Sequence, residues 1–277
     1  MRIQGVGAMV DKAVLPPAAT AMATAPEAAP TAIVVDNLAV RRGGVPVLRG
    51  VSLTIPQGLV TAVVGRSGVG KTTLLGVLNG LVAPEHGTVT VAGSGPLDDA
   101  EALARHRRRT ATVFQDHALI DRLTALDNVL LGLADTRHPL SPLPWPRALR
   151  RRAAEALDLI GLLPRALVRA GRLSGGERQR VGIARALIRK PDILLGDEPF
   201  ASVDPALVAH LGRVLRQAVE RQGVTAVLVL HQIETAMALA DRIVGLAEGR
   251  VVFDGPATAF DAAARTAVFG PRPILSE

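Results

Sequence analysis

Hydrophobic and polar positions alternate in the first strongly patterned part of the chain. Val51, Leu53 and Ile55 are separated by single polar residues, which predicts a strand with one buried face. The next run, residues 59–64, is apolar at almost every position. Such a run predicts a central strand that is buried on both faces.

Other apolar runs predict further strands, and helical patterns lie between them. The predicted strands are residues 33–35, 89–91, 113–114, 193–195, 224–230, 243–246 and 251–253. Helices are predicted at residues 72–79 and 101–109, and Ala153, Leu157 and Ile160 recur at helical spacing on one face. Strands that alternate with helices indicate an α/β core with a parallel sheet. An antiparallel β section is expected around the first central strand and the helix that follows it.

Composition changes along the chain and divides it into three parts. Residues 1–31 are rich in Ala, Pro and Thr without apolar periodicity, which predicts a disordered tail; Met9 or Met22 is an alternative start. The folded domain is predicted to span residues 32–256, with an inserted helical subdomain at about residues 116–180. Residues 257–277 are treated as a C-terminal tail.

Charge and residue usage limit the classes of function. The 277 residues carry a net charge of +7, which suits an anionic partner such as a nucleotide, a membrane surface or nucleic acid, although a generally basic protein fits equally well. There is no cysteine, so disulfides and thiolate metal sites are excluded. No apolar run reaches the roughly 18 residues of a membrane span and no signal-peptide pattern is present. We therefore expect a cytoplasmic protein, with any membrane spans supplied by other chains.

A glycine-rich stretch between a predicted strand and a predicted helix has the complete spacing G-x-x-x-x-G-K-T of a phosphate-binding loop. Its glycines allow a tight turn that points backbone N–H groups at phosphate oxygens. Its lysine supplies a point charge for the β- and γ-phosphates, and the threonine hydroxyl after the lysine is placed to bind Mg²⁺. The nucleotide-binding stretch is Gly65, Arg66, Ser67, Gly68, Val69, Gly70, Lys71, Thr72 and Thr73.

Two adjacent acids follow another buried strand, residues 193–196. Ligands collect at the carboxyl ends of strands in open α/β sheets. Asp197 is therefore predicted to hold Mg²⁺, directly or through water, and Glu198 to polarise the attacking water. Without the upstream phosphate-binding loop, a solvated strand end would be the simpler interpretation.

A third stretch, residues 172–180, reads RLSGGERQR. Ser174 and Glu177 have the spacing of a capping box, which predicts the start of a helix near Gly176. The same geometry exposes N–H groups at a positive helix end, where a phosphate can bind.

Together these motifs resemble the ATP-binding subunit of an ABC transporter over about residues 32–256. The stretch Leu173, Ser174, Gly175, Gly176 and Glu177 is similar to the family's signature motif, with Glu in the place usually held by Gln. The order and separation of the motifs agree with the family. The other matches are Gln115 for the Q-loop, Ser202 and Asp204 for the D-loop, and His231 for the switch histidine.

The resemblance implies a P-loop NTPase fold: a RecA-like core with an antiparallel β subdomain and an inserted helical subdomain. It also implies a head-to-tail homodimer that binds ATP between the phosphate loop of one copy and the signature of the other. In this arrangement Glu198 is the general base and His231 contacts the γ-phosphate, while Thr72, Gln115 and Asp197 hold Mg²⁺. Implied partners are two transmembrane permease subunits and, indirectly, a periplasmic substrate-binding protein. The location implied is the cytoplasmic face of the inner membrane.

Base recognition departs from the family pattern. The family stacks adenine on an aromatic residue, but this chain has no tyrosine and places Arg42 there. A guanidinium group can stack on a base. Alternatively, Arg42 is exposed to solvent and Val47 supplies the apolar contact.

Within the family, several stretches resemble the phosphonate-import branch. They are residues 123–130, 230–232, 240–246 and 249–255. The resemblance implies import of a phosphonate, with phosphate, phosphite or another solute as alternatives, because this subunit does not touch the cargo. An ABC-type ATPase acting on nucleic acid and a small-molecule kinase are the remaining alternatives from other classes; the signature motif argues against the kinase.

Overall fold

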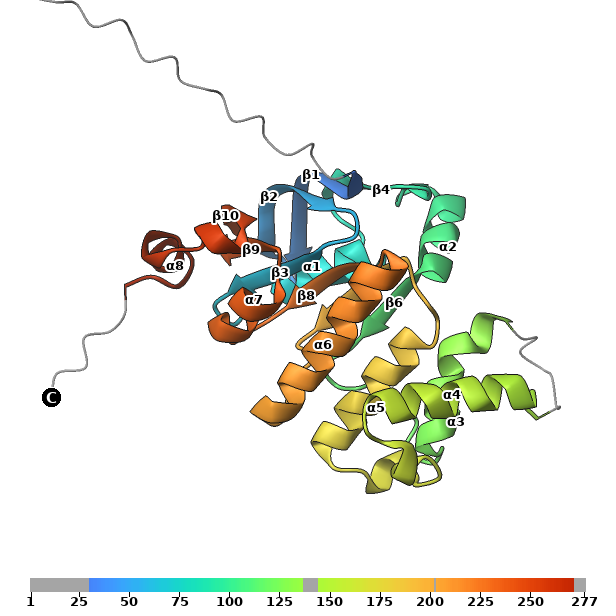
Figure 1. Cartoon of the computed structure of the whole chain (residues 1–277). Helices are drawn as coiled ribbons and strands as arrows, with labels where there is room; N and C mark the ends of the chain where they lie inside the picture. The colour runs from blue at the N-terminus through green and yellow to red at the C-terminus, as the bar shows by residue number, and fades with distance from the viewer. Residues whose placement is uncertain (1–29, 137–143, 202, 272–277) are drawn as a thin grey trace, which may run out of the picture.

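A six-stranded sheet forms the centre of the computed structural model, which describes residues 30–136, 144–201 and 203–271 (Figure 1). Five strands are parallel, and the sixth, β10, pairs antiparallel with β9 at one edge. The prediction of an α/β core with a parallel sheet is therefore confirmed. In spatial order the strands are β10 (Arg250–Pro256), β9 (Arg242–Ala247), β3 (Val60–Gly65), β8 (Thr225–Val229), β7 (Ile193–Asp197) and β6 (Thr110–Val113).

A second, antiparallel sheet packs over one face of the first, as predicted. It has the order β2-β1-β4-β5, and helix α1 (Lys71–Leu78) lies between the two sheets. Side chains from both sheets and from α1 form one continuous hydrophobic cluster. The strands are β1 (Thr31–Arg42), β2 (Val45–Pro56), β4 (His86–Val91) and β5 (Gly95–Pro96).

Strand β3 explains why the phosphate-binding loop is held rigidly. All six of its residues are buried, and successive side chains point to opposite faces of the sheet. Val60, Ala62 and Val64 join the cluster on the helical side, whereas Val63 joins the cluster that contains α1. The loop that follows β3 therefore starts from a strand packed on both faces.

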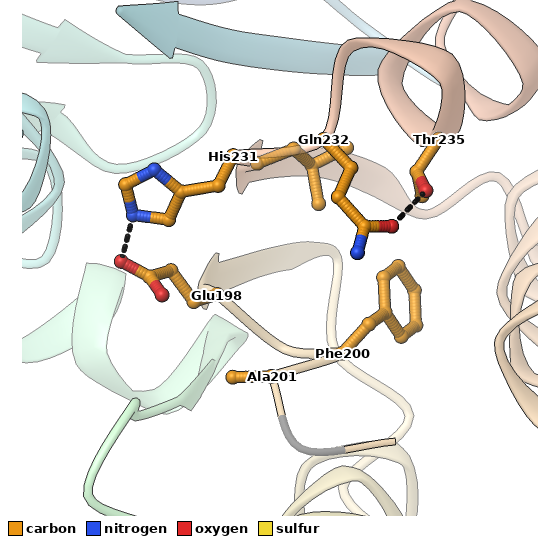
Figure 2. A pocket seen from close by; sticks show the side chains of 7 residues that line it. Glu198, Phe200, Ala201, His231, Gln232 and Thr235 are labelled. Carbon is orange, nitrogen blue, oxygen red and sulfur yellow. Dashed lines mark hydrogen bonds and ion pairs between the residues drawn. The ribbon is translucent and has the colours of Figure 1, made fainter. Parts of the chain in front are cut away.

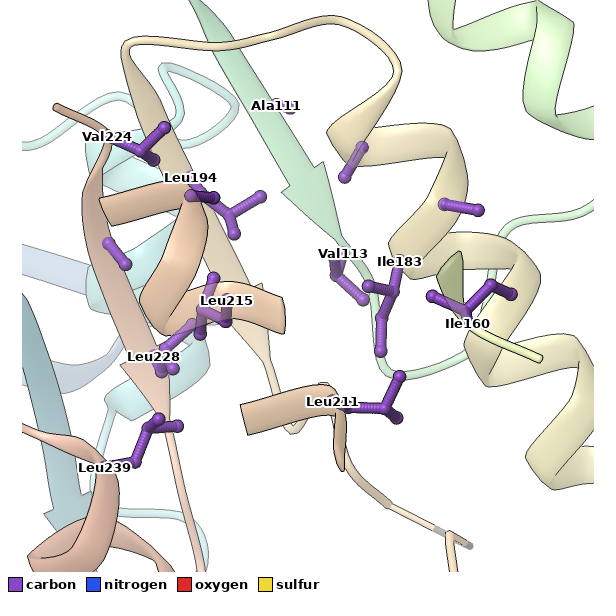
Figure 3. Packing of buried hydrophobic residues seen from close by; sticks show 14 of the residues in the cluster. Ala111, Val113, Ile160, Ile183, Leu194, Leu211, Leu215, Val224, Leu228 and Leu239 are labelled. Carbon is purple, nitrogen blue, oxygen red and sulfur yellow. The ribbon is translucent and has the colours of Figure 1, made fainter. Parts of the chain in front are cut away.

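Helices cover the other face of the central sheet (Figure 3). Ile183 of α5 and Val113 of β6 belong to the same buried cluster, as do Leu211 and Leu215 of α6. Besides α1, the helices that precede the C-terminal segment in the described residues are α2 (Ala100–Arg109), α3 (Ala125–Leu130), α4 (Arg147–Leu159), α5 (Gly175–Leu187), α6 (Pro205–Gln222) and α7 (Ile233–Leu239). Short 3-10 helices are η1 (Leu131–Thr136), η2 (Leu163–Arg165) and η3 (Ala170–Arg172). Across the described residues, no helix is both long and apolar enough to cross a bilayer.

Helix α5 crosses the predicted boundary between the inserted helical subdomain and the core. The prediction placed the boundary at about residue 180, whereas α5 runs without interruption to Leu187. Its second half packs on the central sheet: Ala184 and Ile183 are buried in the same cluster as β3 and β6. One helix thus connects the subdomain to the core.

At both ends of the folded domain, regular structure extends beyond the first and last predicted strands. Residues 1–29 lie outside the described residues, and β1 already begins at Thr31. The segment treated as a C-terminal tail contains η4 (Ala257–Ala259) and α8 (Ala262–Phe269). Val268 of α8 packs so closely on β9 that a Cβ atom at Gly245 would lie 2.3 Å from it. A short, alanine-rich helix has too few large apolar residues to give a clear periodic signal.

We expect Val268→Ala to lower the free energy of unfolding by about 2 kcal/mol, because it removes two buried methyl groups and leaves a cavity. Urea unfolding measures the change. Val252→Ala is the matched control, since Val268 is 2% exposed and Val252 is 42% exposed, and should change stability by less than about 0.5 kcal/mol. Equal effects of the two substitutions would show that α8 does not belong to the folded domain.

Candidate nucleotide-binding site

The phosphate-binding loop connects β3 to α1 and has no room for side chains at two of its glycines. Gly70 has a φ of 110°, a conformation that L residues rarely adopt. A Cβ atom at Gly70 would lie 2.8 Å from the side chain of Leu48, and one at Gly65 would lie 2.4 Å from the carbonyl oxygen of Leu246. Glycine is therefore required at both positions by the packing of neighbouring strands.

Lys71 is buried at the first position of α1. Its side chain is 5% exposed, and its Nζ atom donates hydrogen bonds of 2.8 Å to the carbonyl oxygens of both Gly65 and Arg66. Burial lowers the pKa of Lys71, and the charges of Glu198 and Asp197 oppose that shift. The ammonium group also lies at the positive end of a helix, where a cation is unfavourable. A bound phosphate would supply the missing negative charge.

Thr72 and Asp197 come from elements far apart in sequence and meet at the carboxyl edge of the sheet. The Thr72 hydroxyl donates to Oδ1 of Asp197 at 3.3 Å. Burial raises the pKa of Asp197, and the hydrogen bond from Thr72 partly offsets it. A hydroxyl and a carboxylate are hard oxygen donors of the kind that Mg²⁺ takes, and Mg²⁺ typically uses only one or two carboxylates. The pair therefore fits a magnesium site, although the described residues contain no cluster of three or more His, Cys, Asp or Glu for a metal held by protein alone.

Glu198 has an unusual backbone conformation immediately after β7. Its φ is 50°, which costs roughly 1–3 kcal/mol for a residue other than glycine. Its N–H donates to the carbonyl oxygen of Val229 at 3.1 Å, and its own carbonyl oxygen accepts from the N–H of Ala201 at 3.0 Å. Its Oε1 atom pairs with Nε2 of His231, which follows β8 (Figure 2). The two predicted catalytic side chains therefore face each other.

One cavity of about 550 Å³ brings most of the predicted site together. It joins the phosphate-binding loop, the Q-loop glutamine, the acid after β7 and the histidine after β8. Asp197 is not among the lining residues but contacts Thr72. The residues that line the cavity are Arg42, Val47, Ser67, Gly68, Gly70, Lys71, Thr72, Thr73, Gln115, Glu198 and His231.

The signature stretch does not line this cavity. It lies at the start of α5, where the predicted capping box is confirmed: Ser174 Oγ accepts from the Glu177 N–H at 3.3 Å, and Glu177 Oε2 accepts from the Ser174 N–H at 2.8 Å. Ser174 and Gly175 are exposed. Within one chain, this helix end therefore lies outside the cavity formed by the other motifs.

The remaining predicted site residues lie in loops. Asp204 caps α6, with its Oδ1 accepting from the Leu207 N–H at 3.0 Å, while Ser202 lies outside the described residues. Gln115 lines the cavity, and the loop that follows it turns through two residues with positive φ, His117 and Ala118.

Two polar side chains of α5 support the site and were not predicted from the sequence. The Arg185 guanidinium donates to the carbonyl oxygens of His117 and Ala118, and Gln179 donates to the carbonyl oxygen of Glu198. Both positions follow the signature on the same helix, but the sequence gives no signal for the loops that they reach.

Known proteins that are similar to this chain contain the same kind of nucleotide-binding domain. A family model described as ABC transporter matches residues 48–201. This chain belongs to the ABC transporter family. It is 62% identical over 235 residues to the phosphonates import ATP-binding protein PhnC 2 of Rhodopseudomonas palustris, covering 85% of this chain and 83% of that protein. It is also 48% identical over 222 residues to the phosphite import ATP-binding protein PxtA of Stutzerimonas stutzeri, covering 79% of this chain and 80% of the relative.

Solved structures of ABC cassettes share the fold. A dimeric post-hydrolysis state of the ATP-binding cassette MJ0796, bound to ADP and Pi, superposes with a TM-score of 0.74 at 32% identity and covers 81% of this chain and 98% of that chain. The cbiO1 protein of Clostridium perfringens, part of the ABC transporter complex cbiONQ, has a TM-score of 0.71 at 27% identity and covers 86% and 93%. The predicted P-loop NTPase fold of the ABC type is thus confirmed.

The capping box gives a prediction for the pH dependence of stability. The hydrogen bond from the Ser174 N–H is the main cause that lowers the pKa of Glu177. A lowered pKa in the folded state adds stability above the ordinary carboxyl range, and this stability is lost as pH falls through the folded pKa. Glu177→Gln keeps an acceptor for the cap but has no charge to titrate.

We therefore expect Glu177→Gln to be less stable than the unmodified chain at pH 7 by about 0.3–1 kcal/mol, and the difference to shrink toward zero well below about pH 4. Urea unfolding at several pH values measures it. The exposed Glu220 of α6 is the control, and Glu220→Gln should change stability by less than about 0.5 kcal/mol at each pH. A Glu177→Gln difference that is constant with pH would contradict the lowered pKa of Glu177.

Proposed function

We propose that this chain hydrolyses ATP in sites shared by two copies and thereby drives a membrane importer for a phosphonate or a related small oxyanion of phosphorus. The main observation that supports this proposal is the cavity lined by the phosphate-binding loop, Glu198 and His231 but not by the signature stretch. In this proposal one chain supplies the phosphate-binding and water-activating groups, and a second chain supplies the start of its α5 with the signature stretch.

The residues of the cavity have separate roles in this proposal. Lys71 exchanges the carbonyl oxygens of its own loop for the β- and γ-phosphates. The Glu198 carboxylate accepts a proton from water as the water oxygen attacks the γ-phosphorus and the bond to the β–γ bridging oxygen breaks. His231 orients Glu198 and contacts the γ-phosphate. Mg²⁺, when bound by Thr72, Asp197 and Gln115, would neutralise phosphate charge.

The second copy supplies the exposed end of α5. Gly175 and Gly176 carry N–H groups without intrahelical partners at a positive helix end, a chemistry that binds phosphate. The dimeric MJ0796 structures support a homodimer, and we propose that its two copies are arranged head to tail. Arg42 and Val47 both line the cavity, so both remain candidates for the contact with adenine.

The names of the relatives support the proposed cargo, and the family membership supports the further partners. Proteins named for the import of phosphonates and of phosphite are similar to this chain over most of their length. We propose that two transmembrane permease subunits bind the dimer at the cytoplasmic face of the membrane, and that a periplasmic substrate-binding protein delivers the cargo. An ATPase that acts on nucleic acid is the less favoured alternative.

Glu198→Gln tests the proposed chemistry. Steady-state ATP hydrolysis should fall at least about 100-fold, because general-base catalysis contributes about that much, while ATP binding measured by calorimetry persists. Glu234→Gln, at an exposed position in the first turn of α7, is the control and should hydrolyse ATP like the unmodified chain. Hydrolysis in the unmodified chain should also stop when a chelator removes Mg²⁺. Unchanged turnover in Glu198→Gln would exclude Glu198 as the base.

A growth assay tests the cargo. Cells whose copy of the gene carries Glu198→Gln should fail to grow on a phosphonate or phosphite as sole phosphorus source and should grow normally on phosphate. Cells with Glu234→Gln should grow on all three. Normal growth of the Glu198→Gln cells on phosphonate and on phosphite would contradict the proposed cargo without affecting the assignment as an ATPase.

A further inference from the structure

Helix α5 contributes a completely buried amide to the interior of the site. The side chain of Gln179 is 0% exposed, and its Nε2 atom donates to the main-chain carbonyl oxygen of Glu198 at 3.2 Å. Its Oε1 atom is equally buried and accepts no hydrogen bond from the described residues. A buried polar atom without a partner is unfavourable. Stability alone therefore does not explain a glutamine at this position.

The hydrogen bond from Gln179 reaches the main chain of Glu198. Glu198 has a left-handed backbone conformation, and such a residue persists only where its surroundings hold both adjoining peptide groups. Main-chain atoms of Val229 and Ala201 provide two of the bonds to these peptide groups. The side chain of Gln179 provides a further hydrogen bond, to the carbonyl oxygen of Glu198.

The orientation of this backbone sets the direction of the Glu198 carboxylate. Rotation of the peptide group after Glu198 changes ψ, and any linked change of φ swings Cβ away from His231. Gln179 lies five residues after Ser174 on the same helix, which is about 7.5 Å along the axis. A single rigid helix thus joins the signature end to the main chain of the proposed base.

We propose that Gln179 is a positioning residue for ATP hydrolysis, which holds the main chain of Glu198 so that its carboxylate faces His231 and the attacking water. The inference rests on the proposed role of Glu198 as general base. Gln179 itself does not line the cavity, so its replacement should affect the chemical step and leave ATP binding unchanged.

Gln179→Met has a similar length but no donor, and Gln179→Glu has nearly the same shape with a carboxylate in place of the amide. For both we expect kcat to fall about tenfold, because a small misplacement of a catalytic group has an effect of at least this size. KM for ATP should stay within about twofold, since the phosphate-binding loop is untouched. Gln217→Met, at an exposed position of α6, is the matched control and should retain the full kcat.

A double-mutant cycle separates positioning from a merely structural role. In single-turnover measurements with labelled ATP, adding Gln179→Met to Glu198→Gln should leave the residual rate within about twofold, because the carboxylate that Gln179 positions is already absent. If Gln179→Met lowered the hydrolysis rate by the same factor in the unmodified chain and in Glu198→Gln, the proposal would be overturned. It would also be overturned if Gln179→Met left kcat unchanged, with or without a higher KM for ATP. Failure of both Gln179 variants to fold would also overturn it, since the amide would then serve the fold. A different result would show that the proposed function itself is wrong: the single variant Glu198→Gln would then hydrolyse ATP at the full rate.

Discussion

The buried ammonium group of Lys71 is the interaction on which the rest of the site depends. It lies at the positive end of α1, is nearly closed off from solvent and is held by two carbonyl oxygens of its own loop. Burying a charge in this place is unfavourable unless an anion joins it. The two carboxylates at the end of β7 offset part of the charge, and a bound nucleotide phosphate would offset the rest. Strand β3, packed on both faces, keeps the loop in position.

The parallel sheet turns this local chemistry into an ATPase site by bringing its strand ends to one edge. Strands β3, β7 and β8 are neighbours in the sheet, so the phosphate-binding loop, Glu198 and His231 surround a single cavity. The exposed start of α5 lies outside that cavity, and in the proposed dimer a second copy brings such a helix end to the nucleotide. Because α5 also contacts Glu198 and the loop after Gln115, one helix connects the proposed shared interface to the proposed catalytic residues.

The sequence predicts those features that depend on contiguous residues. Three such features lie where they were predicted, and each is defined within about twenty positions: the strand, glycine loop and helix around Lys71, the two acids at the end of β7, and the capping box of Ser174 and Glu177. The contacts of Gln179 were not predicted, because its partner becomes a neighbour only when α5 packs on the sheet. Helix α8 was missed because an alanine-rich segment has a weak hydrophobic pattern, although Val268 fills the space over Gly245.

Dimerisation of the Glu198→Gln chain in the presence of ATP, measured by sedimentation, tests most directly whether two copies share each site. The account predicts a monomer without ATP and a dimer with it. Adding Ser174→Arg should abolish the dimer and leave the affinity of the monomer for ATP unchanged, because the signature serves the nucleotide of the partner. A dimer that persists with Ser174→Arg, or a monomer that then loses ATP, would contradict the shared site.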